Sequence, residues 1–282
     1  MHSDALSQRR LVATRIAGLL VLTLATAIFA SQSAAQSTDD STPEANPGRP
    51  TIATPATLTP VGYLQFETGF LGAHTSPDFS TQQSWVETTK LSITSRIELL
   101  ASFQPVAHST GPAFTSTDAG DISLGVQAVL WKGEEAKPTI AASYFARVYN
   151  GPAPDLDLGS PSHSILILAS ADFRGFHYDA NAFFNAIAQN SVYRPQFGQT
   201  LSISHQLTEK LSLTGEFWHF TQPFLHGNAV GNLWAIGYTP RKNLVFDAGF
   251  DHGFTSTSTR WEYFAGITYL LPHRLWPNHS SH

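Results

Sequence analysis

The feature that most constrains the fold of this chain is a series of about twelve stretches, each of roughly ten residues, in which apolar and polar side chains alternate. The stretch that begins at Ile122 shows the pattern most clearly, because Ile122, Leu124 and Val126 alternate with polar residues or glycine. A period of two residues is typical of a β-strand, whose successive side chains point to opposite faces of the sheet. The sequence therefore predicts an all-β fold built from many strands of similar length.

The connections between these stretches are alternately short and long. Short gaps fall near 94–95, 174–175 and 208–210, whereas long polar gaps fall near 105–118, 150–163 and 188–196. Such a rhythm is typical of antiparallel hairpins with turns on one side and loops on the other. Since the strands are also close to the about 9–11 residues that cross a membrane, we predict a transmembrane antiparallel up-and-down β-barrel of about 12 strands. The short turns would be periplasmic and the long loops extracellular.

Composition separates this prediction from a soluble β-sandwich, which would also show alternation. Only 13% of the residues are charged and 12% are aromatic, whereas an ordinary soluble domain has about 25% charged residues. Aromatic residues such as Trp218 and Tyr238 gather near strand ends, as they do at the membrane interfaces of a barrel, although Trp218 falls on the polar face of its strand. The charges that are present recur on the polar faces, where burial inside a sandwich core would be costly. These three observations favour the barrel.

The polar faces supply the candidate site residues. These residues carry a formal charge and are Glu67, Arg96, Glu98, Asp121, Arg147, Asp179, Glu216, Asp247, Asp251 and Glu262. We predict that they line the lumen, which at about twelve strands is wider than the eight-stranded interior that side chains fill. Two interpretations remain open at this point. The residues could form a selective, acid-leaning passage with Arg96 and Arg147 as counter-charges, or a salt-bridged network that only stabilises the barrel.

The first residues of the chain predict export. Arg9, Arg10 and Arg15 precede an apolar run, and the small residues at 33–35 offer a cleavage site, which is the order of a secretory signal peptide. The alternative, an uncleaved membrane anchor, is disfavoured because the apolar run falls short of the roughly 20 residues that span a bilayer. We therefore assign residues 1–35 to a cleaved signal peptide.

The rest of the chain divides into three parts. Residues 36–60 are rich in Pro, Ser and Thr and predict a disordered periplasmic lead-in, because such a segment buries too little apolar surface to offset the entropy lost on ordering. Residues 61–271 contain all the predicted strands and form the outer-membrane β-barrel. Residues 272–282 form a C-terminal tail, which is a departure from the many outer-membrane barrels whose last strand ends on a terminal aromatic residue.

Several functions are disfavoured by what the sequence lacks. The chain has no Cys, which excludes thiolate zinc sites and cysteine nucleophiles, and its 16 Lys+Arg against 21 Asp+Glu are no signature of nucleic-acid binding. The histidines show no short metal-ligand spacing, and no segment resembles a nucleophile elbow. We expect no enzymatic activity, no catalytic residue, no cofactor and no metal site. The expected partners are outer-membrane lipid, the barrel-assembly machinery and a small-molecule substrate of unknown identity.

Four segments, Lys90–Leu99, Gly120–Val126, His205–Leu213 and Leu244–Leu271, carry a resemblance to a known family. They are similar to the bacterial outer-membrane channels named for the meta-pathway of phenol degradation. The resemblance implies a Gram-negative outer-membrane transporter that passes small hydrophobic or aromatic molecules. The alternative is an outer-membrane barrel that does not transport, either a lipid-modifying enzyme or a structural surface protein.

Overall fold

The computed structural model describes residues 43–134, 136–156, 161–189 and 191–276. Contacts within the chain divide it after Thr42 into two units, and all of the described residues belong to the second unit, Pro43–His282. The predicted signal peptide therefore lies outside the described residues. Within the described ranges, no helix is long and apolar enough to cross a membrane.

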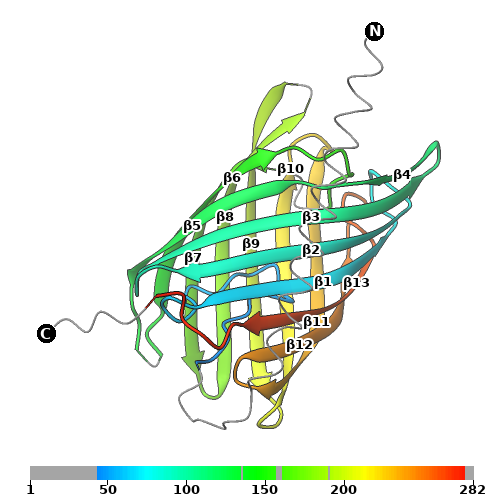
Figure 1. Ribbon diagram of the computed structural model, residues 1–282. Coiled ribbons are helices and arrows are strands. Elements are labelled where there is room, and N and C mark those ends of the chain that lie inside the picture. Colours follow the sequence, from blue (N-terminus) through cyan, green and yellow to red (C-terminus); the bar gives the residue numbers. More distant parts are fainter. Residues whose placement is uncertain (1–42, 135, 157–160, 190, 277–282) are drawn as a thin grey trace, which may run out of the picture. The chain divides into compact units, whose positions relative to one another are not determined.

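The second unit is built from strands in one antiparallel sheet (Figure 1). The strands are β1 (Leu64–His74), β2 (Thr81–Ser92), β3 (Ile97–Gly111), β4 (Phe114–Asp118), β5 (Ile122–Trp131), β6 (Thr139–Tyr149), β7 (Pro161–Phe173), β8 (Phe176–Gln189), β9 (Val192–Gln206), β10 (Leu211–Gln222), β11 (Gly227–Arg241), β12 (Leu244–Gly253) and β13 (Trp261–Leu270). Apart from β4, each strand pairs with its neighbours along the chain, and β1 also pairs with β13. The predicted all-β, up-and-down barrel of about 12 strands is therefore confirmed, with β4 as an addition.

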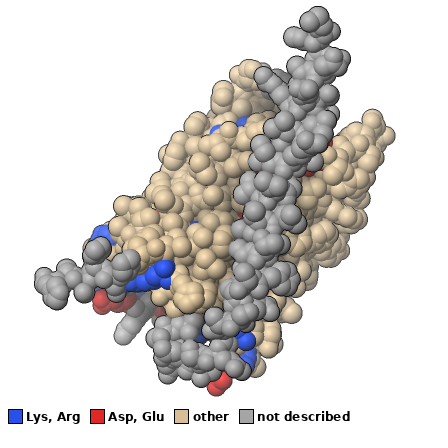
Figure 2. All heavy atoms as spheres, in the orientation of Figure 1, with Lys and Arg blue, Asp and Glu red and all other residues tan. Residues whose placement is uncertain are grey.

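Alternation along the strands places apolar side chains on the outside of the barrel. In β5, Leu124 is 51% exposed and Leu130 is 57% exposed, whereas Gln127, on the other face, is 1% exposed. An apolar exterior with polar groups inside reverses the pattern of a soluble protein and is typical of a membrane barrel. Closure of the sheet also leaves no unpaired strand edge toward lipid, where backbone groups would have no water to bond. In the view of Figure 2, most of the described surface carries no charged side chain.

Two of the predicted long loops are in fact hairpins that continue the strands. β3 extends to Gly111 and pairs with β4, and β8 and β9 continue until only 190–191 separate them. Both hairpins project from the barrel in Figure 1. His108, Ser109 and Thr110 follow one another at this end of β3 and interrupt the apolar alternation, so the sequence pattern failed to reveal it as a strand. Thr and the aromatic residues nevertheless favour strand backbone.

The interior is partly apolar, which the polar-face prediction did not anticipate. Trp218 is 1% exposed and Phe220 is completely buried, and both pack in a cluster with Phe183, Leu166 and Leu168. The assignment of Trp218 to the membrane interface was therefore wrong. It points inward because it shares strand parity with Glu216, as its place on the polar face of the pattern indicated.

Residues 43–60, which we name the plug segment, follow a defined path inside the barrel. The predicted disordered lead-in is therefore wrong for these residues: Ala53 and Ala56 are completely buried, and the backbone of the segment bonds to strands all around the sheet. The prediction considered the segment alone, whereas the polar interior of the barrel supplies the partners that offset its loss of entropy. Figure 1 shows this part of the chain within the ring of strands.

Candidate functional site in the barrel lumen

Carboxylates of the barrel wall hold the backbone of the plug segment. Glu67 on β1 accepts hydrogen bonds from the N–H groups of Gly48 (2.9 Å) and Arg49 (3.1 Å). Glu216 on β10 accepts them from Ile52 (2.8 Å) and Ala53 (2.7 Å). Each carboxylate thus binds two consecutive backbone N–H groups with its two oxygens. Charge-assisted hydrogen bonds of this kind are about twice as strong as neutral ones.

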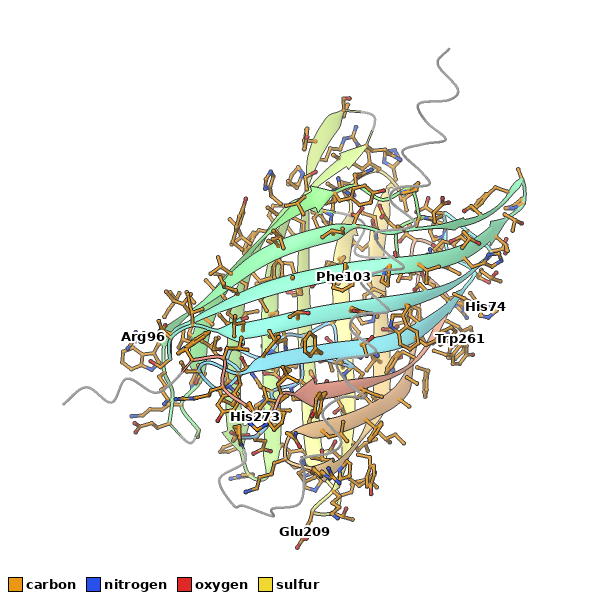
Figure 3. The ribbon with its side chains drawn as sticks, viewed as in Figure 1. His74, Arg96, Phe103, Glu209, Trp261 and His273 are labelled. Atoms are coloured by element: carbon orange, nitrogen blue, oxygen red, sulfur yellow. The ribbon has the colours of Figure 1, made fainter. Side chains whose placement is uncertain are left out.

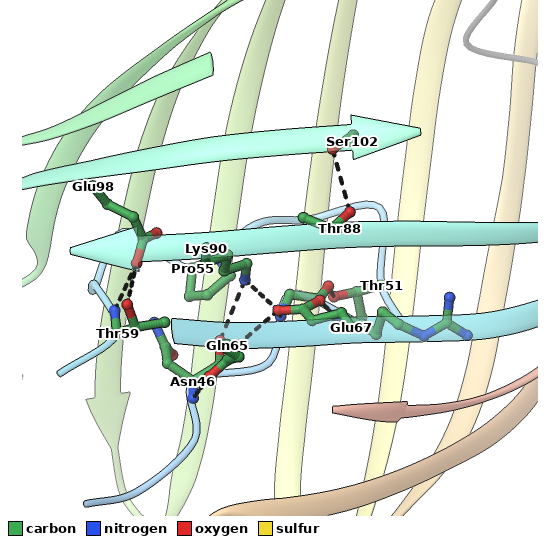
Figure 4. Close-up of polar contacts among 12 residues, drawn as sticks. Asn46, Thr51, Pro55, Thr59, Gln65, Glu67, Thr88, Lys90, Glu98 and Ser102 are labelled. Carbon is green, nitrogen blue, oxygen red and sulfur yellow. Dashed lines mark hydrogen bonds and ion pairs between the residues drawn. The ribbon is translucent and has the colours of Figure 1, made fainter. Parts of the chain in front are cut away.

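The C-terminal half of the plug segment is held in the same way by other strands. The N–H and hydroxyl of Thr59 both donate to Glu98 Oε1 on β3, at 2.9 and 2.6 Å (Figure 4). The side-chain amide of Asn181 on β8 accepts from the N–H of Thr54 and donates to its carbonyl. The N–H of Ala56 donates to Ser170 Oγ, which in turn donates to Asp179. The wall therefore recognises mainly the plug backbone.

Two cations complete the anchoring. The guanidinium of Arg49, which belongs to the plug segment, bonds to both oxygens of Asp247 on β12, at 3.1 and 3.3 Å. Lys90 Nζ lies 2.6 Å from Glu67 Oε1 and is buried beside it. Arg49 fits against the wall because Gly69 and Gly266 are directly paired on β1 and β13. A Cβ atom at either glycine would lie 2.6 Å from the guanidinium.

The residues predicted to line the lumen differ in their burial and location. Those that are buried and face the interior are Glu67, Glu98, Asp179, Glu216, Asp247 and Asp251. Asp121 and Arg147 form an ion pair at 3.1 Å, and Glu262 is half-buried on the wall of a cavity. Arg96 differs from all of these residues: it lies in the β2–β3 turn and is exposed, at the end of the barrel that also carries Glu209 (Figure 3). Its assignment to the lumen was wrong, because a tight turn ends the alternation on which that assignment depended.

Other residues of the site were missed by the sequence analysis. Lys90 and Gln65 share inward parity with Glu67 in the observed register, and their polarity on a strand was an available signal. Arg49 had no such signal, because it lies in a segment without periodicity.

A cavity of ≈ 200 Å³ lies between the plug segment and the wall. Its apolar wall residues are Leu71, Val86, Trp218, Phe220, Leu233 and Phe264. The plug segment contributes Arg49, Pro50 and Ile52, and the remaining lining residues are Leu156, Asp251 and Glu262. Trp218 Nε1 donates to Asp251 Oδ2 at 2.6 Å, which fixes the indole against the cavity. The cavity therefore combines a mainly apolar wall with a few polar groups.

The cavity lies farther from the short turns than some of the plug anchors. Glu67, Glu98 and Asp179 lie near the strand ends that carry the short turns. The cavity residues Leu71 and Phe264 lie farther along β1 and β13, toward the long connections. Leu156 of the β6–β7 connection lines the cavity together with Arg49, Pro50 and Ile52 of the plug segment.

Comparison with known proteins agrees with this architecture. The solved structure of an outer membrane channel from Pseudomonas putida F1 is similar with a TM-score of 0.54 and 14% identity, over 77% of this chain and 98% of that one. The KdgM porin (TM-score 0.49, 10% identity, 73% and 98% of the chains) and the Pseudomonas putida toluene transporter TodX (0.42, 11%, 79% and 93%) are more distant. No curated protein matches the sequence.

The family comparison covers most of the chain. Residues 33–271 match the model of the family described as "Putative MetA-pathway of phenol degradation". This match includes the plug segment and every strand of the barrel. The chain therefore belongs to this phenol-degradation family, as the resemblance in its strand and turn segments predicted.

Proposed function

We propose that the protein is a channel of the bacterial outer membrane that passes small hydrophobic or aromatic molecules and needs no cofactor. The observation that carries the proposal is the mainly apolar cavity in the lumen. Its volume suits a molecule of one aromatic ring, since an engineered apolar cavity of about 150 Å³ binds benzene. The apolar exterior of the barrel and the family membership support the membrane location.

The location of the plug segment gives the proposal a mechanism. Because the plug segment lies between the cavity and the short-turn end, a bound molecule can leave on that side only when the segment shifts. Its anchors are mainly side chains of the wall and are separate from the strand ladders, so a shift leaves the backbone pairing of the barrel intact. The short turns would face the periplasm, and the long connections the exterior, as in other outer-membrane barrels.

Uptake by cells tests this proposal. Cells that express the protein should accumulate a labelled hydrophobic solute such as toluene faster than cells that lack it, at equal outer-membrane content of other barrels. The protein should fractionate with the outer membrane and show heat-modifiable migration on gels. Equal uptake by both strains, together with no conductance in planar bilayers, would overturn the transport proposal and favour a barrel that does not transport.

A further inference from the structure

The barrel wall binds the side chain of Arg49 as a protein binds a ligand. The guanidinium bonds to both oxygens of Asp247, at 3.1 and 3.3 Å, and the side chain of Asp247 is only 2% exposed. Among the described residues, Arg49 is the cation that forms an ion pair with Asp247. The negative charge of Asp247 is therefore compensated by the plug segment and not by the wall.

Two glycines leave room for the guanidinium beside Asp247. Gly266 on β13 is directly opposite Asp247 on β12, and Gly69 on β1 is directly opposite Gly266. A Cβ atom at Gly69 or Gly266 would lie 2.6 Å from Arg49. Glycine is the residue that lets a bound group approach the backbone this closely. We name Asp247, Gly69 and Gly266 the guanidinium cradle.

We propose that the guanidinium cradle is a binding site for a small planar cation, a guanidinium or an amidinium, which Arg49 occupies as an internal ligand. A planar cation presents two parallel N–H donors to a carboxylate, whereas an ammonium is a compact point charge. A free planar cation competes with Arg49 for Asp247, and its binding releases the plug segment. This competition rests on the proposed function, in which the plug segment shifts.

The cavity next to the cradle determines which planar cations bind best. Arg49 lines this cavity together with apolar side chains such as Leu71 and Phe264. A ligand with its cationic group in the cradle therefore has an apolar space nearby for an attached ring, and burial of apolar surface is favourable. An aromatic amidine such as benzamidine should bind more tightly than guanidine itself.

Removal of the internal ligand should leave the cradle open to an added one. Arg49→Ala removes the part of the side chain that corresponds to ethylguanidinium. In the full-length protein, maleimide labelling of Ala53→Cys, completely buried in the native protein, reports release of the plug segment. Arg49→Ala should raise this labelling rate about tenfold, because Asp247 loses its charged partner. Millimolar ethylguanidinium should restore the slow rate, whereas N-ethylurea (planar but neutral) and tetramethylammonium (charged but not planar) should not.

With Arg49 present, a planar cation should act in the opposite direction. Arg49 fills the cradle while the plug segment is in place, so benzamidine binds only after the arginine leaves and shifts the equilibrium toward release. At ten times its dissociation constant for the open cradle, benzamidine should speed the labelling of Ala53→Cys about tenfold. Benzamide, its neutral isostere, should leave the rate unchanged.

Variants of the cradle locate the effect. In the Arg49→Ala background, Gly266→Ala fills the space of the guanidinium and Asp247→Asn removes the charge, so either change should abolish the response to ethylguanidinium. Glu209→Gln, in the exposed β9–β10 turn, should leave the response intact. A response that survives both cradle variants, or an equal response to N-ethylurea, would overturn the proposal. The benzamidine measurement keeps Arg49, so it tests the proposal even if Arg49→Ala does not fold.

Toluene uptake separates this proposal from the proposed function. If ethylguanidinium restores slow labelling but cells with and without the protein take up toluene equally, the transport proposal fails and the cradle keeps its role. If uptake depends on the protein but benzamidine does not speed labelling with Arg49 present, the cradle proposal fails and transport stands. Heat-modifiable migration confirms that each variant compared is a folded barrel.

Discussion

The barrel wall and the plug segment are held in place by different kinds of interaction. The wall is a continuous backbone ladder, in which β8, for example, pairs with β9 from Phe176 to Gln189. The plug segment bonds to the wall mainly through wall side chains, among them Glu67 and Glu216. Substitution cannot remove the backbone groups of the wall, but it can remove each plug anchor. The plug segment should therefore detach under changes that leave the barrel closed.

A disulfide between plug and wall should have the largest effect. Ser170 Oγ lies 2.7 Å from the N–H nitrogen of Ala56, which keeps the two Cα atoms within the span that a disulfide bridges. Ala56→Cys with Ser170→Cys therefore allows a single disulfide in a chain that has no other Cys. If the plug segment must shift for passage, the oxidised variant should lose protein-dependent toluene uptake and regain it after reduction. The two single variants are the controls. Uptake that is equal in the oxidised and reduced forms would show that passage does not need the plug segment to move.

Removal of one anchor should have the next largest effect. Glu216→Ala leaves the N–H groups of Ile52 and Ala53 without their acceptor, at a cost of about 3 kcal/mol for two charge-assisted hydrogen bonds. The open state of the plug segment should then be about 100-fold more populated. Maleimide labelling of Ala53→Cys, completely buried in the native protein, measures this population as a labelling rate. Glu209→Ala in the same background should not change the rate, and a barrel that unfolds with Glu216→Ala would contradict the independence of plug and wall.

A substitution in the glycine pair beneath Arg49 should release the plug segment to a smaller extent, and a second substitution should cancel this effect. In Gly266→Ala, the added Cβ would lie 2.6 Å from the guanidinium and displace it from Asp247, at a cost of about 1–2 kcal/mol in plug affinity. Arg49→Ala removes the clash, so Gly266→Ala should have little further effect in that background. A double-mutant cycle on the labelling rate of Ala53→Cys measures the coupling. Additive effects of the two substitutions would mean that the alanine acts on the wall.

The wall could be predicted from the sequence far better than the plug segment. Strand alternation is a local signal, so β5 with Leu124, Val126 and Gln127 is evident from periodicity alone. The order of the plug segment depends on groups distant along the chain: Ile52 bonds to Glu216, 164 positions away. Composition predicts only whether a segment folds by itself, and this segment takes its partners from the barrel.

The candidate site, too, could be predicted from the sequence only in part. The inward parity of Glu67, Glu98, Glu216 and Asp247 could be read from alternation, and these residues are buried inside the barrel. That Glu67, Glu98 and Glu216 bind a peptide backbone, and Asp247 an arginine side chain, could not be predicted, because nothing in their spacing distinguishes a partner within the chain from water. The apolar cavity was missed for a related reason. Trp218 and Phe220 share the polar parity of β10, and the prediction treated that face as uniformly polar.

The smallest effect on stability is expected at Arg96, which the sequence analysis grouped with Arg147 as a counter-charge in the lumen. Arg96 is exposed in the β2–β3 turn, whereas Arg147 is paired with Asp121 inside the barrel. Arg96→Gln should change the free energy of unfolding by less than about 0.5 kcal/mol, as surface substitutions generally do, and should leave uptake unchanged. Arg147→Gln should destabilise the barrel by about 1–3 kcal/mol, because it removes a charge-assisted bond to Asp121. Gel-shift melting of the two variants compares them directly, and an equal loss of stability would place Arg96 back among the interior charges.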